Sequence, residues 1–159
     1  MTRYFETFYN AEPMDELSEA EARAAGSYTV EDDAAMRRYR QIIDHQLYSI
    51  VYAGWDDPTE PLADLERLGE SVRAEIHSPV ERFPDNTYSW RIWYIDPQRR
   101  IIKILEPQYA ADGSSLRQAL RRPDGELVSY TIYHYDRDGY LLELVTHAPD
   151  GTITGREDA

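Results

Sequence analysis

Apolar and polar residues alternate in short runs along most of this chain, and alternation with a period of two is typical of β-strands with one buried face. Short segments rich in proline, aspartate and glycine separate the runs and predict turns between successive strands. The strand-like runs are residues 27–32, 36–43, 46–53, 71–77, 80–83, 87–95, 100–106, 115–120, 126–135 and 140–147.

Two segments depart from this alternation and predict short helices. In residues 18–25, Ser18 with Glu21 three positions later forms the pattern of a capping box. In residues 60–68, three leucines at three-residue spacing predict a buried stripe, and Thr59 is the expected N-cap. Together with the strands, these helices predict a single α+β domain over residues 1–159 that is mainly β, a large twisted antiparallel meander.

The turns near the C-terminus predict a strand register. Type I turns followed by a glycine bulge at Gly125 and Gly139 would set Arg122 opposite Glu126 and Asp136 opposite Tyr140. Counting outward from these turns gives one apolar face and one polar face. The expected apolar face carries Leu116, Leu120, Val128, Tyr130, Ile132, Leu142 and Leu144, and the opposite face carries Arg117, Arg121, Thr131, Tyr133, Tyr135 and Glu143.

Charge limits the function classes. The formal net charge is −13, and it is concentrated in residues 1–35, with nine acidic residues against two arginines, and in residues 56–86, with nine against three. Such a field repels phosphate backbones, so no nucleic-acid partner is expected, whereas a cationic protein is attracted. The chain has no cysteine, which excludes disulfides and thiolate chemistry. No signal-like or membrane-spanning segment is seen, so a cytoplasmic protein without a membrane partner is expected.

Residues 130–152 resemble the YD repeats of bacterial Rhs-type proteins. Tyr133, Tyr135, Asp136, Gly139 and Leu141 match the repeat pattern, and a weaker echo covers residues 94–105. In that family the repeats are strand–turn–strand scaffold units without catalytic residues. The resemblance implies an antiparallel meander, and it implies a function only by association: some small acidic bacterial proteins with such units look like immunity proteins encoded beside Rhs-type toxins.

Candidate catalytic residues are sparse. None of the four histidines has the spacing of a metal-binding motif, no nucleophile-elbow serine is present, and no cofactor is expected. His134 falls on the predicted apolar face beside Leu142, where a neutral histidine fits better than a catalytic one. An enzyme that uses a carboxylate pair, or His134 with Glu143, is the least favoured alternative because the predicted register separates those two residues.

The acidic and aromatic residues favour a non-catalytic protein-binding domain, specifically an immunity-type inhibitor of a cationic toxin. Acidic groups would steer the encounter and aromatic groups would anchor the complex. A small-ligand binder with an aromatic pocket of Trp90, Tyr94 and Tyr130 remains the alternative, and a homodimer is possible. The predicted partner-binding residues are Glu31, Asp32, Asp33, Asp56, Asp57, Glu60, Trp93, Tyr133 and Tyr135.

Overall fold

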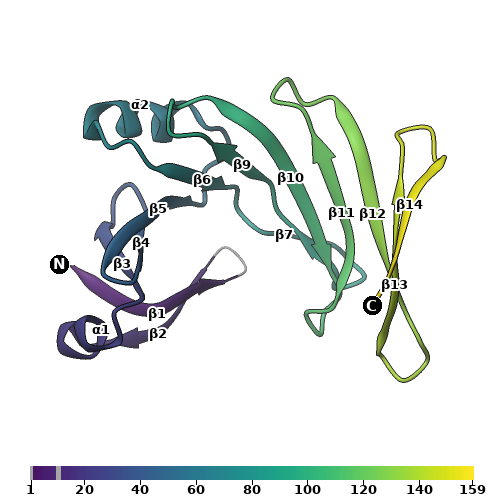
Figure 1. Ribbon diagram of the computed structural model, residues 1–159, viewed down its shortest axis with the longest axis horizontal. Helices are drawn as coiled ribbons and strands as arrows, with labels where there is room; N and C mark the ends of the chain where they lie inside the picture. Colours follow the sequence, from purple (N-terminus) through teal and green to yellow (C-terminus); the bar gives the residue numbers. More distant parts are fainter. Residues whose placement is uncertain (1, 10–11) are drawn as a thin grey trace. The chain divides into compact units, whose positions relative to one another are not determined.

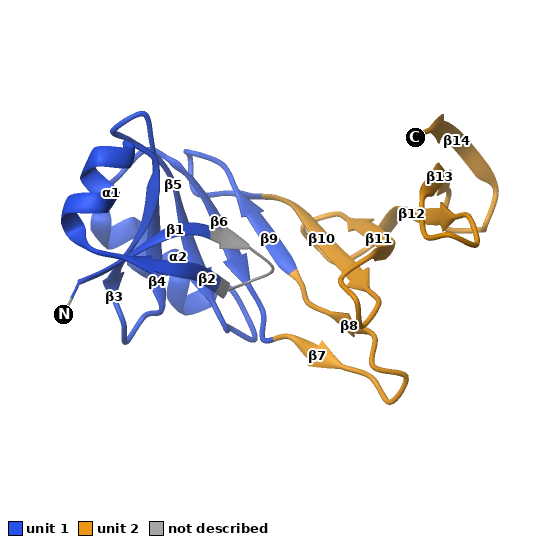
Figure 2. Ribbon diagram, turned by 90° about the horizontal axis from the view of Figure 1, so that it is seen from below, with its two compact units in different colours: residues 1–79, 92–101 blue, residues 80–91, 102–159 orange. Residues whose placement is uncertain are grey.

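The computed structural model describes residues 2–9 and 12–159 (Figure 1). Over these residues the chain forms fourteen strands and two short helices, and all but one of the strand pairs described below are antiparallel. The predicted fold class, a mainly β α+β protein with an antiparallel meander, is therefore confirmed. The chain divides into two compact units, residues 1–79 with 92–101 and residues 80–91 with 102–159 (Figure 2). The prediction of one domain stays a prediction.

The first unit contains both helices and the strands that pair around them. Its elements are β1 (Arg3–Tyr9), β2 (Glu12–Leu17), α1 (Glu19–Ala25), β3 (Tyr28–Asp33), β4 (Arg38–Ile43), β5 (Gln46–Ala53), α2 (Thr59–Leu68), β6 (Arg73–His77) and β9 (Ile92–Ile95). The strands lie in the order β9-β6-β5-β4-β3-β1-β2. The predicted meander of three strands over residues 27–53 is present as β3, β4 and β5.

Helix α1 begins and ends as its sequence predicts. The Ser18 side chain accepts a hydrogen bond from the Glu21 N–H, and the Glu21 carboxylate accepts one from the Ser18 N–H at 2.8 Å, which completes the capping box. Gly26 ends the helix at φ 77°, a left-handed conformation that costs glycine little.

Helix α2 connects β5 to β6, and these two strands are parallel. A parallel pair needs a long crossover, and a helix in the crossover covers one face of the sheet. The expected N-cap was wrong: Thr59 is the first helical residue, Pro58 precedes it, and the Asp57 carboxylate accepts the Thr59 N–H at 2.8 Å. Gly69 ends the helix as expected, with φ 71°.

Strand β5 is the centre of the first unit because it is buried on both faces. Tyr52 points toward α2, where its hydroxyl donates to Asp64. Alternation then directs Val51 and Ala53 to the opposite face, where they pack with Phe5 and Tyr39 in one apolar cluster. Neither helix in the described part of the chain is long and apolar enough to cross a membrane.

The second unit is built from strands alone. Its elements are β7 (Glu81–Arg82), β8 (Tyr88–Ser89), β10 (Ile101–Tyr109), β11 (Ser115–Arg121), β12 (Leu127–Tyr135), β13 (Leu141–His147) and β14 (Ile153–Asp158). Strands β10 to β14 pair in chain order, β8 pairs with β10, and β7 pairs with β8.

The predicted hairpin turn recurs along this unit. In each turn of five residues, the N–H of the first residue donates to the carbonyl of the fifth, and the N–H of the fourth donates to the carbonyl of the first. These turns are residues 83–87, 110–114, 122–126, 136–140 and 148–152. The fourth residue is left-handed each time: Gly125 has φ 91°, and Asn86, with φ 64°, takes the same place in the first of these turns. These contacts confirm the type I turn with a following bulge, and they confirm that Arg122 faces Glu126 and Asp136 faces Tyr140.

The register predicted beyond those turns was wrong by one residue. Arg121 pairs with Leu127 but Leu120 pairs with Ser129, so Val128 is an extra residue on its strand. Leu142 is the corresponding extra residue in the next hairpin, where His134 pairs with Glu143 rather than with Leu142. Each extra residue is a second bulge three positions after the turn glycine, and it shifts every later pair by one.

The shift exchanges the residues of the two faces. Residues that pair directly across two strands lie on the same face of the sheet. Tyr133 therefore lies on the same face as Leu144 and Leu120, whereas Ile132 lies on the same face as Arg117. Tyr130 lies on the Arg117 face, where its ring stacks on His147 at 4.9 Å and beneath the Arg117 guanidinium at 4.6 Å. The predicted apolar face, which put Tyr130 and Ile132 together with Leu120 and Leu144, is therefore wrong.

Candidate functional site

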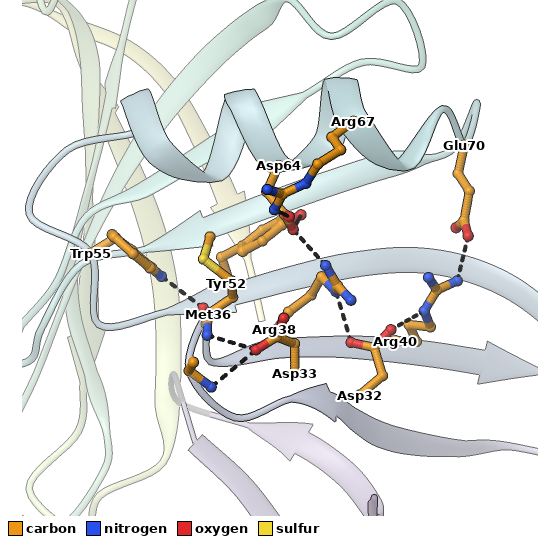
Figure 3. A network of polar contacts seen from close by, with 11 residues as sticks. Asp32, Asp33, Met36, Arg38, Arg40, Tyr52, Trp55, Asp64, Arg67 and Glu70 are labelled. Atoms are coloured by element: carbon orange, nitrogen blue, oxygen red, sulfur yellow. Dashed lines mark hydrogen bonds and ion pairs between the residues drawn. The ribbon is translucent and has the colours of Figure 1, made fainter.

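A buried carboxylate joins α2 to the sheet of the first unit (Figure 3). Asp64 lies on the inner face of the helix, and its side chain is 1% exposed. Its Oδ2 accepts hydrogen bonds from Arg38 Nη1 at 2.6 Å and from Tyr52 Oη at 2.8 Å, while Oδ1 accepts one from Arg67. The three donors come from β4, β5 and α2 itself, so one carboxylate connects three elements.

A second carboxylate extends this network along β4. Asp32 is the extra residue of a bulge between β3 and β4, because Glu31 pairs with Tyr39 and Asp33 pairs with Arg38. Its two oxygens accept hydrogen bonds from Arg38 Nε at 2.8 Å and from Arg40. Arg40 also donates to Glu70 just after α2, at 2.6 Å. The positive charges of Arg38 and Arg40 are therefore balanced by carboxylates of the network itself.

The network changes the ionisation of its members. Burial alone would raise the pKa of Asp64, but hydrogen bonds from Arg38, Arg67 and Tyr52 outweigh it and hold that pKa below its ordinary value. Burial and the neighbouring Asp64 carboxylate raise the pKa of the Tyr52 phenol. Asp64 is therefore ionised and Tyr52 neutral at neutral pH, which is the arrangement that the observed hydrogen bonds need.

Stability is expected to depend on acid through Asp64. Because its folded pKa lies below the unfolded value of about 3.9, its contribution is present above that value and lost as the pH falls through the folded pKa. The stability difference between wild type and Asp64→Asn should therefore be constant between about pH 5 and 7 and should shrink below about pH 4. Urea unfolding at several pH values measures it, and a difference that grew in acid would contradict the assignment.

The acidic residues at the start of α2 lie outside the network. Asp56, Asp57 and Glu60 are exposed, and no ion pair to any of them is found among the described residues. Hydrogen bonds from Thr59 lower the pKa of Asp57, so it keeps its charge. These three residues, called the α2 acidic edge below, form a surface whose charge is not compensated by the nearby arginines.

The other predicted acidic residues are occupied by internal contacts. Glu31, Asp32 and Asp33 all lie in β3. Glu31 is 8% exposed; it accepts a hydrogen bond from the Tyr39 hydroxyl at 3.2 Å and lies 3.5 Å from Arg3. Asp33 accepts two backbone N–H groups of the following loop. Only the α2 acidic edge therefore combines the predicted charge with free access from solvent.

The predicted aromatic anchors belong to different units. Trp93 is 5% exposed in the core of the first unit, where it pairs with Ile76. Tyr133 and Tyr135 are half-buried in the second unit, and the Tyr135 hydroxyl donates to the Ser115 carbonyl at 2.8 Å.

Two residues of the alternative aromatic pocket, Trp90 and Tyr130, are not brought together. Trp90 stacks on Tyr88 and Tyr109, and Tyr109 lies on the same face as Pro107. Tyr130 lies on the other face, because it pairs with Ala119, which pairs with Glu106 next to Pro107. Trp90 and Tyr130 are therefore on opposite faces of the second unit, and a shared pocket does not form there.

The histidine prediction also needs correction. His134 is exposed and directly opposite Glu143, so the two residues share a face, contrary to the predicted register. The Glu143 carboxylate is engaged by Arg156 at 2.9 Å. His77 ends β6 and lies 3.0 Å from Glu75. Within residues 2–9 and 12–159, no three histidine, aspartate or glutamate side chains are grouped so that they could hold a metal ion.

Comparison of the chain with protein-family models, with curated proteins and with solved structures found no significant match. What the surface does is therefore inferred from its geometry and charge.

Proposed function

We propose that this protein is a non-catalytic protein-binding domain that captures a cationic partner through the α2 acidic edge. This proposal rests on one observation: the arginines near α2 are paired within the protein, whereas in the described structure the acidic residues at the start of the helix are not. Arg38, Arg40 and Arg67 are bound to carboxylates of the buried network, whereas Asp56, Asp57 and Glu60 face solvent. Charge of one sign on an exposed surface accelerates association with a partner of the opposite sign.

We further propose that the partner is a toxin and that the protein is its immunity-type inhibitor. The support is the resemblance of residues 130–152 to YD repeats together with the net charge of −13. Positive charge favours binding to nucleic acid or to a membrane surface, so a toxin that acts on either would offer a basic surface that an acidic inhibitor covers without any chemistry of its own.

The α2 acidic edge is expected to control capture of this partner. Asp56→Asn, Asp57→Asn and Glu60→Gln together should lower the association rate by about tenfold at low salt, with little change at high salt where charges are screened. The tagged protein should retain a basic partner from a lysate of its own cells at low salt. Mass spectrometry would identify this partner, and surface plasmon resonance would then measure the association rate of the purified pair.

The matched control carries the same change of charge elsewhere: Asp124→Asn, Asp150→Asn and Glu157→Gln, all exposed in the second unit. Asparagine at position 57 keeps an acceptor for the Thr59 N–H, so the helix start is preserved. Binding that was insensitive to salt, or equally reduced in both triple variants, would contradict the role of α2. Protection from the captured protein on co-expression tests the inhibitor assignment.

A further inference from the structure

Three aromatic rings form one stacked group in the second unit, called the aromatic stack below. Tyr88, Trp90 and Tyr109 have ring centroids 5.3 to 6.3 Å apart, and their planes lie within 16° of one another. Tyr88 and Tyr109 are register partners on β8 and β10, and both are half-buried. Arg82 already lies over the Tyr88 ring at 5.4 Å, which shows that this stack accepts a guanidinium.

Negative charge flanks the aromatic stack. Tyr88 follows the turn 83–87 and Tyr109 precedes the turn 110–114, so Asp85 and Asp112 lie in the turns at this end of β8 and β10. Both carboxyl groups are exposed, and hydrogen bonds from Thr87 and Ser114 respectively hold their pKa values below the ordinary range. Aromatic faces bordered by ionised carboxylates favour a cation over an anion or a neutral apolar group.

A polar atom without a partner lies within the same group. Trp90 is 6% exposed, and its buried indole N–H has no acceptor in the described part of the chain. A buried donor without an acceptor costs stability, and a ligand that supplies one removes that cost. A peptide segment with a cationic side chain offers both requirements, since its backbone carbonyls are acceptors.

We infer that the aromatic stack, bordered by Asp85 and Asp112, is an anchor site for an arginine-bearing segment of the cationic partner. The inference rests on the proposed function for the identity of the occupant, because the segment belongs to the same partner. It differs from that proposal in the residues that bind the partner and in the rate that they control. The α2 acidic edge acts on the rate of encounter, whereas a guanidinium held against aromatic rings slows dissociation.

The test uses N-acetyl-arginine methylamide as the probe and nuclear magnetic resonance as the readout. The chain has three tryptophans, so the indole N–H signal of Trp90 is separable from those of Trp55 and Trp93. Titration of the probe should shift the Trp90 signal saturably and leave the other two unchanged. Tyr109→Leu should weaken binding by about tenfold, and Tyr109→Phe, which keeps the ring, should bind within about twofold of wild type.

Several outcomes would overturn the inference. An equal response to the citrulline analogue would show that the site does not select a cation. A Trp90 shift with protein concentration and no probe would assign the stack to a second copy of the chain. No shift at any probe concentration, or a response lost in the α2 triple variant and kept in Tyr109→Leu, would place the site elsewhere. The probe needs no captured partner, so failure of the proposed function and failure of this site are distinguishable.

Discussion

Replacing Asp64 with alanine is expected to lower the free energy of unfolding by about 3–5 kcal/mol, the loss typical of a buried ion pair from which one partner is removed. The Asp64 side chain is 1% exposed and is the acceptor for Arg38, Tyr52 and Arg67. Without it, Arg38 remains buried with only Asp32 to balance its charge, and the Tyr52 hydroxyl loses its acceptor. Urea unfolding at pH 7, followed by tryptophan fluorescence, measures the change.

Two further variants separate the contributions. Arg67→Ala removes a donor whose side chain is 74% exposed, so its cost should stay below about 1 kcal/mol. Asp64→Asn keeps the shape and one acceptor but removes the charge, and its cost should fall between the other two. A loss in Asp64→Ala no larger than in Arg67→Ala would show that the buried network does not hold α2 to the sheet.

The fold class followed from the sequence because its signals are local. The alternation of β3 and the Asp-Gly turns act over a few residues, and the structure confirms both. The register did not follow, since the bulges at Val128 and Leu142 come three residues after a turn and have no turn-forming residue of their own. Bulges of this kind depend on the twist of the whole sheet, and the sequence of a single hairpin does not specify that twist.

The buried network was missed although the sequence holds a signal for it. Pro61, Asp64 and Leu65 are buried on the inner face of α2, so a carboxylate stands where the helix period demands an apolar residue. A stripe of leucines was expected instead, and of its three members only Leu65 is fully buried. The partners Arg38 and Arg40 alternate on β4, which puts both on one face. The sequence signal for such a network is an acidic residue at a helix position where the period predicts an apolar one, together with two arginines spaced two residues apart on a strand.

The structure shows which of two roles Trp93 has, a core residue or an anchor for a partner, which the sequence could not distinguish. Tryptophan was expected to anchor a partner, but Trp93 is 5% exposed and opposes Ile76, which opposes Tyr52 in the row of side chains beneath α2. Trp93→Ala is therefore expected to lower the free energy of unfolding by about 3–5 kcal/mol through the cavity it leaves. Trp93→Phe keeps most of the volume and should cost less.

If Trp93 is a core residue, replacing it should change the stability of the protein and leave the affinity for the partner unchanged. Trp93→Phe, at a temperature where it is folded, should bind the captured partner with the affinity of wild type, because the replacement is hidden from the surface. Tyr109→Leu should show the opposite behaviour, with a smaller loss of stability and a weaker complex, because Tyr109 is half-buried within the aromatic stack. A Trp93→Phe variant of normal stability that bound poorly would mean that the partner reaches this side chain, and the core assignment would then have to give way to the anchor.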